Sequence, residues 1–249
     1  DATGGGGGFL GASGIRNGLG IAFDTYQNAD FGDIANDHTN FIKTDAPIDQ
    51  ARLSDQVDLG NIEDGNWHKV QVSWDVAQQT LSYSFDGKQA GTLTGDLANQ
   101  YFAGFNDAYF GFTAATGGLS NPQQVEINKL DAVLEDGTQV HLNKPSLVIP
   151  GMGGGVTLNG NAHYDAATDT FILTQDAPGQ KGALMSNERI DLHSDFDINF
   201  NIYLGNKDAG ADGMAFVLHN DPFGADATGG GGGLLGASGI RNGVGIAFD

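Results

Sequence analysis

The chain has 249 residues, no cysteine, 40 glycines, 15 phenylalanines and a formal net charge of −20 at pH 7. The charge argues against nucleic-acid binding, because phosphate neutralisation needs clustered Lys and Arg, and the lack of cysteine excludes disulfides and thiolate metal sites. No apolar run approaches the roughly 20 residues of a membrane span, so we expect no membrane partner, and the glycine and phenylalanine content favours a β-rich fold.

The first 24 residues recur at the end of the chain. Residues 226–249 match residues 1–24 at 22 of 24 positions, and the differences are Phe9/Leu234 and Leu19/Val244. A spacing this long suits a whole domain rather than a solenoid repeat, so we expect tandem near-identical domains in the parent protein, with this chain an excised fragment. The duplicated strands at 15–24 and 240–249 should compete for one place. Either one copy is displaced, or molecules exchange halves head to tail.

Residues 18–45 begin as a strand, Leu19–Phe23, and continue as a loop rich in oxygen donors. Ca²⁺ takes about six to eight oxygen ligands. Of the 31 acidic residues, 27 are Asp and four are Glu, and the shorter Asp suits loops and calcium. We interpret the loop as a metal site with candidate ligands Asp24, Tyr26 (through its carbonyl), Asn28, Asp33 and His38. His38 would suit a neighbouring transition ion better, and a solvated acidic turn is the alternative.

The middle of the chain predicts strands and turns. Asp86-Gly87 is a hairpin signal, weak helical periodicity within 96–105 indicates a short turn of helix, and 115–121 reads as a loop. Alternating patterns predict strands at 67–75, 80–85, 88–94, 109–114 and 125–134.

Residues 143–155, with two prolines and four glycines, predict a linker between domains. Strands are expected beyond it at 156–158, 162–165, 170–173, 182–186, 196–204 and 214–219, which makes the chain an all-β sandwich. We expect residues 1–142 to be the C-terminal portion of one repeat and 156–249 the N-terminal portion of the next, together about one sandwich domain.

Two further motifs could contact a ligand. The carboxylate of Asp212, in Ala211-Asp212-Gly213 before an apolar strand, could accept hydrogen bonds from two sugar hydroxyls, although an ordinary turn is the alternative. The glycine runs 4–8 and 229–233 leave backbone N–H groups open to close approach. No Lys-Ser/Thr follows either run, which argues against a phosphate loop and leaves a flexible linker as the alternative.

Five segments carry patterns that occur together in one family. They are ADGMAFVLHNDP (211–222), GGGGGLLG (229–236), FDTYQNADFGD (23–33), NWHKVQVSWD (66–75) and YFGFTAATG (109–117). In consistent circular order, they resemble the legume-type (L-type) lectins and, more closely, their bacterial tandem-domain relatives. Residues 156–249 resemble the first part of that domain and residues 1–142 the rest. The resemblance implies a concanavalin A-like jelly-roll sandwich of antiparallel sheets.

The resemblance also implies roles at matching positions. Asp24, Tyr26, Asn28 and Asp33 would ligate Ca²⁺, while Asp212 would accept two sugar hydroxyls. The remaining sugar contacts would be the backbone N–H of Gly233 or its duplicate Gly8, the Asn28 amide, the Tyr26 ring, and Gly118 with Leu119. Ala22, and Ala247 in the duplicate, stand where the family usually has a Glu that binds a second ion such as Mn²⁺. Losing that carboxylate weakens a second site.

We therefore expect a calcium-dependent carbohydrate-binding module of a large secreted bacterial adhesin, acting at the extracellular cell surface on glycans or biofilm polysaccharide. The main alternative is a calcium-rigidified spacer repeat without sugar binding. We expect no enzyme, because glycoside hydrolases need two facing carboxylates. The four glutamates, Glu63, Glu126, Glu135 and Glu188, form no E-x-D-x-E arrangement, although two Asp could serve instead. The residues do not name the sugar.

Overall fold

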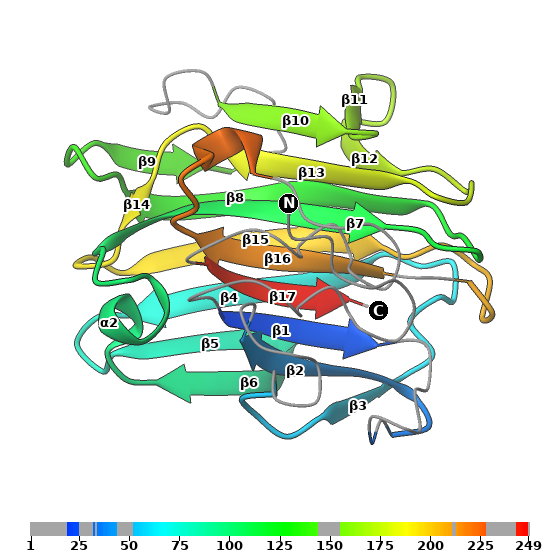
Figure 1. Cartoon of the computed structure of the whole chain (residues 1–249), viewed down its shortest axis with the longest axis horizontal. Coiled ribbons are helices and arrows are strands. Elements are labelled where there is room, and N and C mark those ends of the chain that lie inside the picture. Colours follow the sequence, from blue (N-terminus) through cyan, green and yellow to red (C-terminus); the bar gives the residue numbers. More distant parts are fainter. Residues whose placement is uncertain are drawn as a thin grey trace.

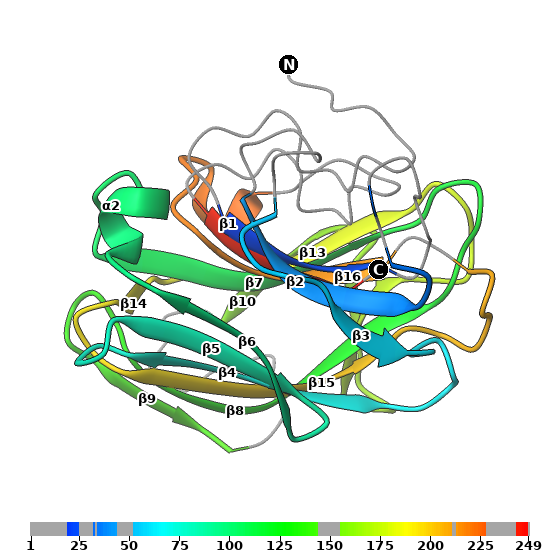
Figure 2. The ribbon, with the colours of Figure 1, turned by 90° about the horizontal axis from the view of Figure 1, so that it is seen from below.

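The computed structural model describes residues 19–24, 32, 34–43, 52–143, 155–210, 213–227 and 243–248, of which 19–24, 42–43 and 243–248 are described by backbone alone. Within these residues, two β-sheets pack face to face (Figures 1 and 2). Among these described residues, helical structure is confined to α2 (Leu97–Tyr101) and the 3-10 turn η2 (Gly224–Asp226). The predicted all-β, antiparallel sandwich is confirmed.

The first sheet, which we call the front sheet, takes its strands from both parts of the chain. In spatial order they are β10 (Val156–Gly160), β13 (Lys181–Ser186), β7 (Asp107–Ala115), β16 (Gly213–His219), β17 (Gly243–Phe248), β1 (Leu19–Asp24), β2 (Asp37–Lys43) and β3 (Val57–Gly60), with β14 (Ile190–Asp191) pairing with β7.

The second sheet, the back sheet, is interleaved in the same way. Its order is β11 (His163–Asp165), β12 (Thr170–Thr174), β8 (Gln123–Val133), β15 (Phe196–Tyr203), β4 (His68–Asp75), β5 (Thr80–Phe85) and β6 (Lys88–Thr94), with β9 (Gln139–Leu142) pairing with β8. Strands from before and after residues 143–155 therefore share both sheets and one core.

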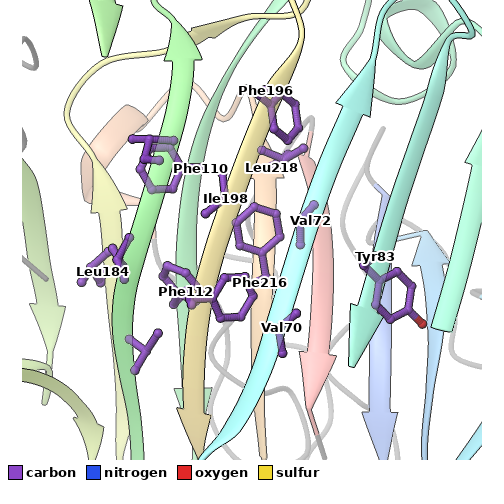
Figure 3. Close-up of a cluster of buried hydrophobic side chains, with 14 of the residues drawn as sticks. Val70, Val72, Tyr83, Phe110, Phe112, Leu184, Phe196, Ile198, Phe216 and Leu218 are labelled. Atoms are coloured by element: carbon purple, nitrogen blue, oxygen red, sulfur yellow. The ribbon is translucent and has the colours of Figure 1, made fainter. Parts of the chain in front are cut away.

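The core between the sheets follows from period-2 patterning. In β15, FDINFNIY, every second residue is buried, because successive side chains on a strand point to opposite faces. Phe200 of β15 meets Phe112 and Phe216 of the front sheet, with ring centroids 4.7 Å and 5.6 Å apart. Figure 3 shows Phe112 and Phe216 in this core together with Ile198 of β15. Such aromatic pairs contribute about 0.5–1.5 kcal/mol each beyond their burial. This packing fixes how the two sheets face each other.

Local sequence signals correspond to the turns. Asp86 and Gly87 have φ values of 47° and 77°, the positive pair that a type I′ hairpin requires, and they connect β5 to β6. Asp96 caps α2 by accepting a hydrogen bond from the backbone N of Asn99. The strands predicted at 19–23, 67–94, 109–134 and 156–219 agree with the observed strands within two residues at each end. β2, β3, β9 and β14 were not predicted.

The two copies of the duplicated strand lie side by side in the front sheet. β1 and β17 pair in parallel, with Leu19 opposite Val244, Gly20 opposite Gly245 and Ile21 opposite Ile246. The expectation that the copies exclude each other from one sheet is therefore wrong. β17 pairs with β16 on its other side, and β1 pairs with β2. The sheet accommodates both copies because their unpaired edges pair with each other.

No helix within the described ranges is long and apolar enough to cross a membrane.

Candidate functional site

One end of the front sheet, opposite α2, collects the segments that carry the predicted site (Figure 1). Gly213, the first residue of β16, pairs with Ala115, the last of β7. Asp24, the last residue of β1, pairs with His38 near the start of β2. β7 and β1 therefore end here, and β16 begins here. We call this the site end.

The loop between β7 and β8, residues 116–122, places two predicted sugar contacts at the site end. Leu119 is 48% exposed, and the space beside the Gly118 Cα is open. Thr116 holds the base of the loop: its N–H donates to the carbonyl of Gln180 at 2.9 Å, and its Oγ1 donates to the carbonyl of Ala177 at 2.7 Å. The exposed side chain of Leu119 is therefore carried by a loop with a fixed base.

A polar contact joins this loop to the segment that precedes Asp212. Ser120 Oγ donates to Asp176 Oδ1 at 2.8 Å, and the Lys207 ammonium lies 2.5 Å from the same oxygen. Lys207 is the main reason why the pKa of the Asp176 carboxyl is lowered, followed by the Ser120 hydrogen bond. All three side chains lie at the surface, where such ion pairs contribute little stability. Their effect here is to set the position of the loop.

Asn121 is the buried anchor beneath the loop. Its Nδ2 donates to Glu63 Oε1 at 2.5 Å and to the carbonyl of Lys207 at 3.0 Å, and its side chain is fully buried. Gly205 and Gly210 lie against this amide so closely that a Cβ on either would collide with it. Glycine at both positions therefore lets the segment 205–210 wrap around Asn121.

Glu63 lies in an acidic environment below the anchor. Burial raises its pKa to about 8, with Asp37 and Asp208 adding repulsion, while the Asn121 hydrogen bond opposes the shift. Burial likewise raises the pKa of Asp37 to about 6, although its carboxylate accepts a hydrogen bond from the Ile62 backbone N at 2.8 Å. Asp37 and Glu63 thus hold together the segments beneath the site end through their hydrogen bonds. With a pKa of about 8, Glu63 is mostly protonated at neutral pH.

The predicted metal loop is only partly described. Asp24 is present as backbone, while Tyr26, Asn28 and Asp33 lie outside the described residues. The prediction of a loop as far as Asp45 is wrong for residues 37–43, where the chain forms strand β2. The segment DHTNFIK is mostly polar and so did not indicate a strand, yet its Phe41 is fully buried in the core.

His38 is buried in β2 and has a partner at each ring nitrogen. Nδ1 lies 3.1 Å from the carbonyl of Asn36, and Nε2 lies 2.7 Å from Nε2 of Gln56. This pattern fits a neutral imidazole that donates from Nδ1 and accepts at Nε2. A metal ion at His38 would have to replace one of these partners, and its role as a ligand stays a prediction.

The donor chemistry of the predicted loop fits calcium. Two carboxylates, an amide oxygen and a carbonyl are the hard oxygen ligands that Ca²⁺ prefers, and Asp24 stands at the end of β1 where that loop begins. Ala22 pairs with Asn40, whose Oδ1 is buried without a hydrogen-bond partner in the described part of the chain. Among the described residues, no group of three or more His, Asp or Glu side chains is arranged to hold a metal ion.

The other predicted sugar contacts, Asp212, Gly233 and Gly8, also lie outside the described residues. The nearest described residues on either side of Asp212 are Gly210, which packs on Asn121, and Gly213, which starts β16 with a φ of 115°. Of the predicted contacts, the structure thus brings Gly118 and Leu119 to the same end of the sheet as the backbone of Asp24.

Sequence reasoning missed the residues that support the loops. Glu63 was weighed only as a hydrolase carboxylate, and Asn121 only as the end of a loop. The two partners of Asn121, Glu63 and Lys207, lie 58 and 86 positions away from it in the chain, separations that no local pattern reveals. The Asn121-Pro122 dipeptide is typical of a turn, but such a signal does not identify a buried amide.

Comparisons with known proteins agree with this arrangement. The chain matches the family model for the legume lectin beta-barrel domain over residues 1–129 and 152–249. It is 37% identical over 91 residues to the pesticidal crystal protein Cry22Aa of Bacillus thuringiensis, covering 36% of this chain and 12% of that protein. It is 38% identical over 98 residues to the serine-rich adhesin for platelets of Staphylococcus aureus (strain MRSA252), covering 38% of this chain and 7% of that protein.

These alignments span only a small part of the relatives, so they describe a module and not a whole protein. The family and the adhesin relative point to a non-enzymatic binding domain, and to a protein type that typically holds metal ions. The sandwich, the loops gathered at the site end and the family match over both parts of the chain lead to one assignment. The chain belongs to the legume lectin β-barrel (L-type lectin) domain family.

Proposed function

We propose that the chain is a calcium-dependent carbohydrate-binding module of a large secreted bacterial adhesin, which attaches cells to glycans or to biofilm polysaccharide. Family membership and the similarity to a staphylococcal adhesin support this function and an extracellular position at the cell surface. The net charge of −20 also favours neutral or cationic sugars over strongly anionic ones.

Calcium would supply rigidity and charge at the loop, and the protein residues would do the recognition. Asp24, Asn28 and Asp33, with the carbonyl of Tyr26, would hold the ion. Asp212 would accept hydrogen bonds from two sugar hydroxyls. The Tyr26 ring would stack on the sugar, and the backbone N–H of Gly233 or Gly8, the Asn28 amide, Gly118 and Leu119 would complete the site.

One observation carries the proposal. Strand register brings the end of β1, the end of β7 and the start of β16 to the site end of the front sheet, although these segments lie far apart in the chain. Leu119 is exposed on a loop that Thr116 and Asn121 anchor, and it presents an apolar surface at the site end. An apolar contact beside polar loops suits a sugar, whose C–H faces are apolar and whose hydroxyls need hydrogen bonds.

Glycan-array binding of the whole chain, with calcium and with EDTA, tests the function. We expect retention on at least one glycan with calcium, loss of retention in EDTA, and loss in Asp212→Asn at an unchanged melting temperature. Asp136→Asn is the matched control, since Asp136 lies in the exposed turn between β8 and β9, at the far end of the sandwich. Absence of binding to every glycan in calcium would rule the proposal out.

A spacer repeat without sugar binding is a second candidate, because β17 lies between β16 and β1 in the front sheet. Neighbouring strands lie about 4.8 Å apart. With β17 between β16 and β1, Asp24 stands one strand further from β16 than it would in a sheet with a single copy. If the array shows no binding while calcium still raises the melting temperature, the spacer function is favoured.

A further inference from the structure

Two nearly identical strands occupy the centre of the front sheet. β1 reads LGIAFD and β17 reads GVGIAF, which are overlapping windows of the duplicated segment with one conservative change between Leu19 and Val244. They run in parallel and in register, so that Ile21 lies opposite its own copy, Ile246. Every other strand pairing within the described residues is antiparallel.

Each of the two copies also pairs, along its other edge, with an antiparallel strand. β17 bonds to β16 along its whole length, from Met214 opposite Phe248 to His219 opposite Gly243. β1 bonds to β2 from Gly20 opposite Ile42 to Asp24 opposite His38. Because the copies are parallel and in register, the edge of β1 that faces β17 is equivalent to the edge of β17 that faces β16. One copy could therefore bond to β16 and β2 at once, in a fully antiparallel sheet.

The boundary between the copies is shorter than the two strand pairings that flank it. Its pairing covers residues 19–21 and 244–246, whereas β16 pairs with all of β17, and parallel pairs are slightly less stable per residue than antiparallel ones. Replacing one copy by the other preserves the pairing with β16 or β2. The strand pairings of the sheet are therefore the same whichever copy occupies a position, and whichever molecule supplies that copy.

We propose that β1 and β17 are interchangeable and that the boundary between them is a docking surface for a second copy of this chain, which exchanges β17. The occupant follows from the pairing itself, since the edge of β1 already bonds to a strand of β17's sequence, and a second copy supplies an identical strand. In the sequence, residues 228–242 connect β17 to the rest of the chain. Reciprocal exchange closes a two-fold dimer in which every strand pairing is kept.

Electrostatics sets when exchange occurs. Each chain carries a net charge of −20, so two chains repel each other at low ionic strength. Salt screens this repulsion, with a screening length of about 10 Å at 0.1 M that becomes shorter at higher salt concentration. The exchanged dimer should therefore increase with both protein concentration and salt.

Proline substitutions test interchangeability, since proline removes a strand hydrogen bond and is excluded from central strands. We expect Ile21→Pro and Ile246→Pro each to lower the melting temperature by a few degrees, because the remaining copy bridges β16 and β2. The double variant should lose far more than the sum of the two. Ile198→Pro in β15, a central strand without a copy, is the matched control and should unfold the protein. Additive losses in the double variant would overturn the proposal.

Cysteine cross-linking tests the partner directly, because the natural chain contains no cysteine. Gly20→Cys and Gly245→Cys chains are mixed, unfolded together, refolded at several concentrations and salt levels, and oxidised. We expect a disulfide-linked heterodimer that increases with concentration and salt and exceeds the dimer formed by either variant alone. The doubly substituted chain at high dilution should instead close its disulfide within one molecule. A mixture that yields no more dimer than the separate variants would refute exchange.

Discussion

The side-chain amide of Asn121 donates to the buried carboxyl of Glu63 across 2.5 Å, joining two segments that are 58 positions apart in the chain. The same amide donates to the carbonyl of Lys207, so one side chain connects the loop that carries Leu119, the start of the β3–β4 connection and the segment before Asp212. The geometry of the site end therefore depends on a residue beneath it.

Removing that amide should cost stability. In Asn121→Ala, Glu63 and the Lys207 carbonyl lose their donor while remaining buried, and an unsatisfied buried group costs about 1–3 kcal/mol. Urea unfolding measures the change. Asn66→Ala is the matched control, because Asn66 also donates to a carboxylate, that of Asp64 at 2.8 Å, but in an exposed position. Its effect should stay within about 0.5 kcal/mol, and equal losses for the two variants would contradict the anchoring role.

Stability should fall as pH rises through the neutral range because of Glu63. Its pKa is about 8 in the folded protein, against 4.5 as the ordinary value. Between these values the unfolded chain releases the proton that the folded chain keeps, so the free energy of unfolding decreases with pH, by at most about 1.4 kcal/mol per unit.

Glu63→Gln keeps the shape of the side chain and removes the titration. Urea midpoints from pH 5 to pH 8 should be flatter for this variant than for the natural chain. Asp37, whose pKa is raised to about 6, adds a decrease of the same sign below that pH, which the variant should retain. Parallel curves for the two proteins above pH 6 would show that Glu63 is ionised throughout.

Gly205 should tolerate no side chain. It has a φ of 91°, and a Cβ there would collide with the Asn121 side chain. Gly137 has a similar φ of 85° with open space around it, so Gly137→Ala measures backbone strain alone, about 1–2 kcal/mol. Gly205→Ala should cost about 1–3 kcal/mol more, because of the added overpacking. Thermal and urea melts of the two variants check this, and equal costs would disprove the close packing.

Leu119 should matter for binding and not for stability. Leu119→Ala removes exposed apolar surface from the site end, so we expect weaker retention on whichever glycan the chain binds, at an unchanged melting temperature. Phe105→Ala is the control, since Phe105 is also 48% exposed but lies just before β7, at the other end of the sandwich. If both variants weaken glycan retention equally, Leu119 is not part of the site.

Calcium should raise the melting temperature in proportion to the logarithm of its concentration above the dissociation constant, and Asp33→Asn should abolish most of that shift. Mn²⁺ added to calcium-saturated protein should give little further stabilisation, since Ala22 supplies no carboxylate and pairs with Asn40, an amide. Ala22→Glu should restore a response to Mn²⁺. A full Mn²⁺ response in the natural chain would show that Asn40 or His38 compensates for the missing ligand.

Sequence patterns predicted most of the sandwich because period-2 alternation and turn residues act locally. Phe196–Tyr203 and the Asp86-Gly87 turn are read directly from neighbouring residues. β2 was not predicted because Asp37 and His38 are buried polar residues whose partners come from other segments, Ile62 for Asp37 and Gln56 for His38. The family motifs located the candidate site, whereas its support by Glu63 and Asn121 depends on contacts between distant segments.

The parallel pairing of β1 with β17 has a mechanical consequence. β1 is entered from its Leu19 end, and β17 is left from its Phe248 end, so tension along the chain pulls these two strands in opposite directions along their common axis. Their hydrogen bonds then share the force together, whereas an antiparallel hairpin pulled from its open end breaks its bonds one at a time. In single-molecule pulling, the chain should therefore resist as one unit and yield in a single high-force event.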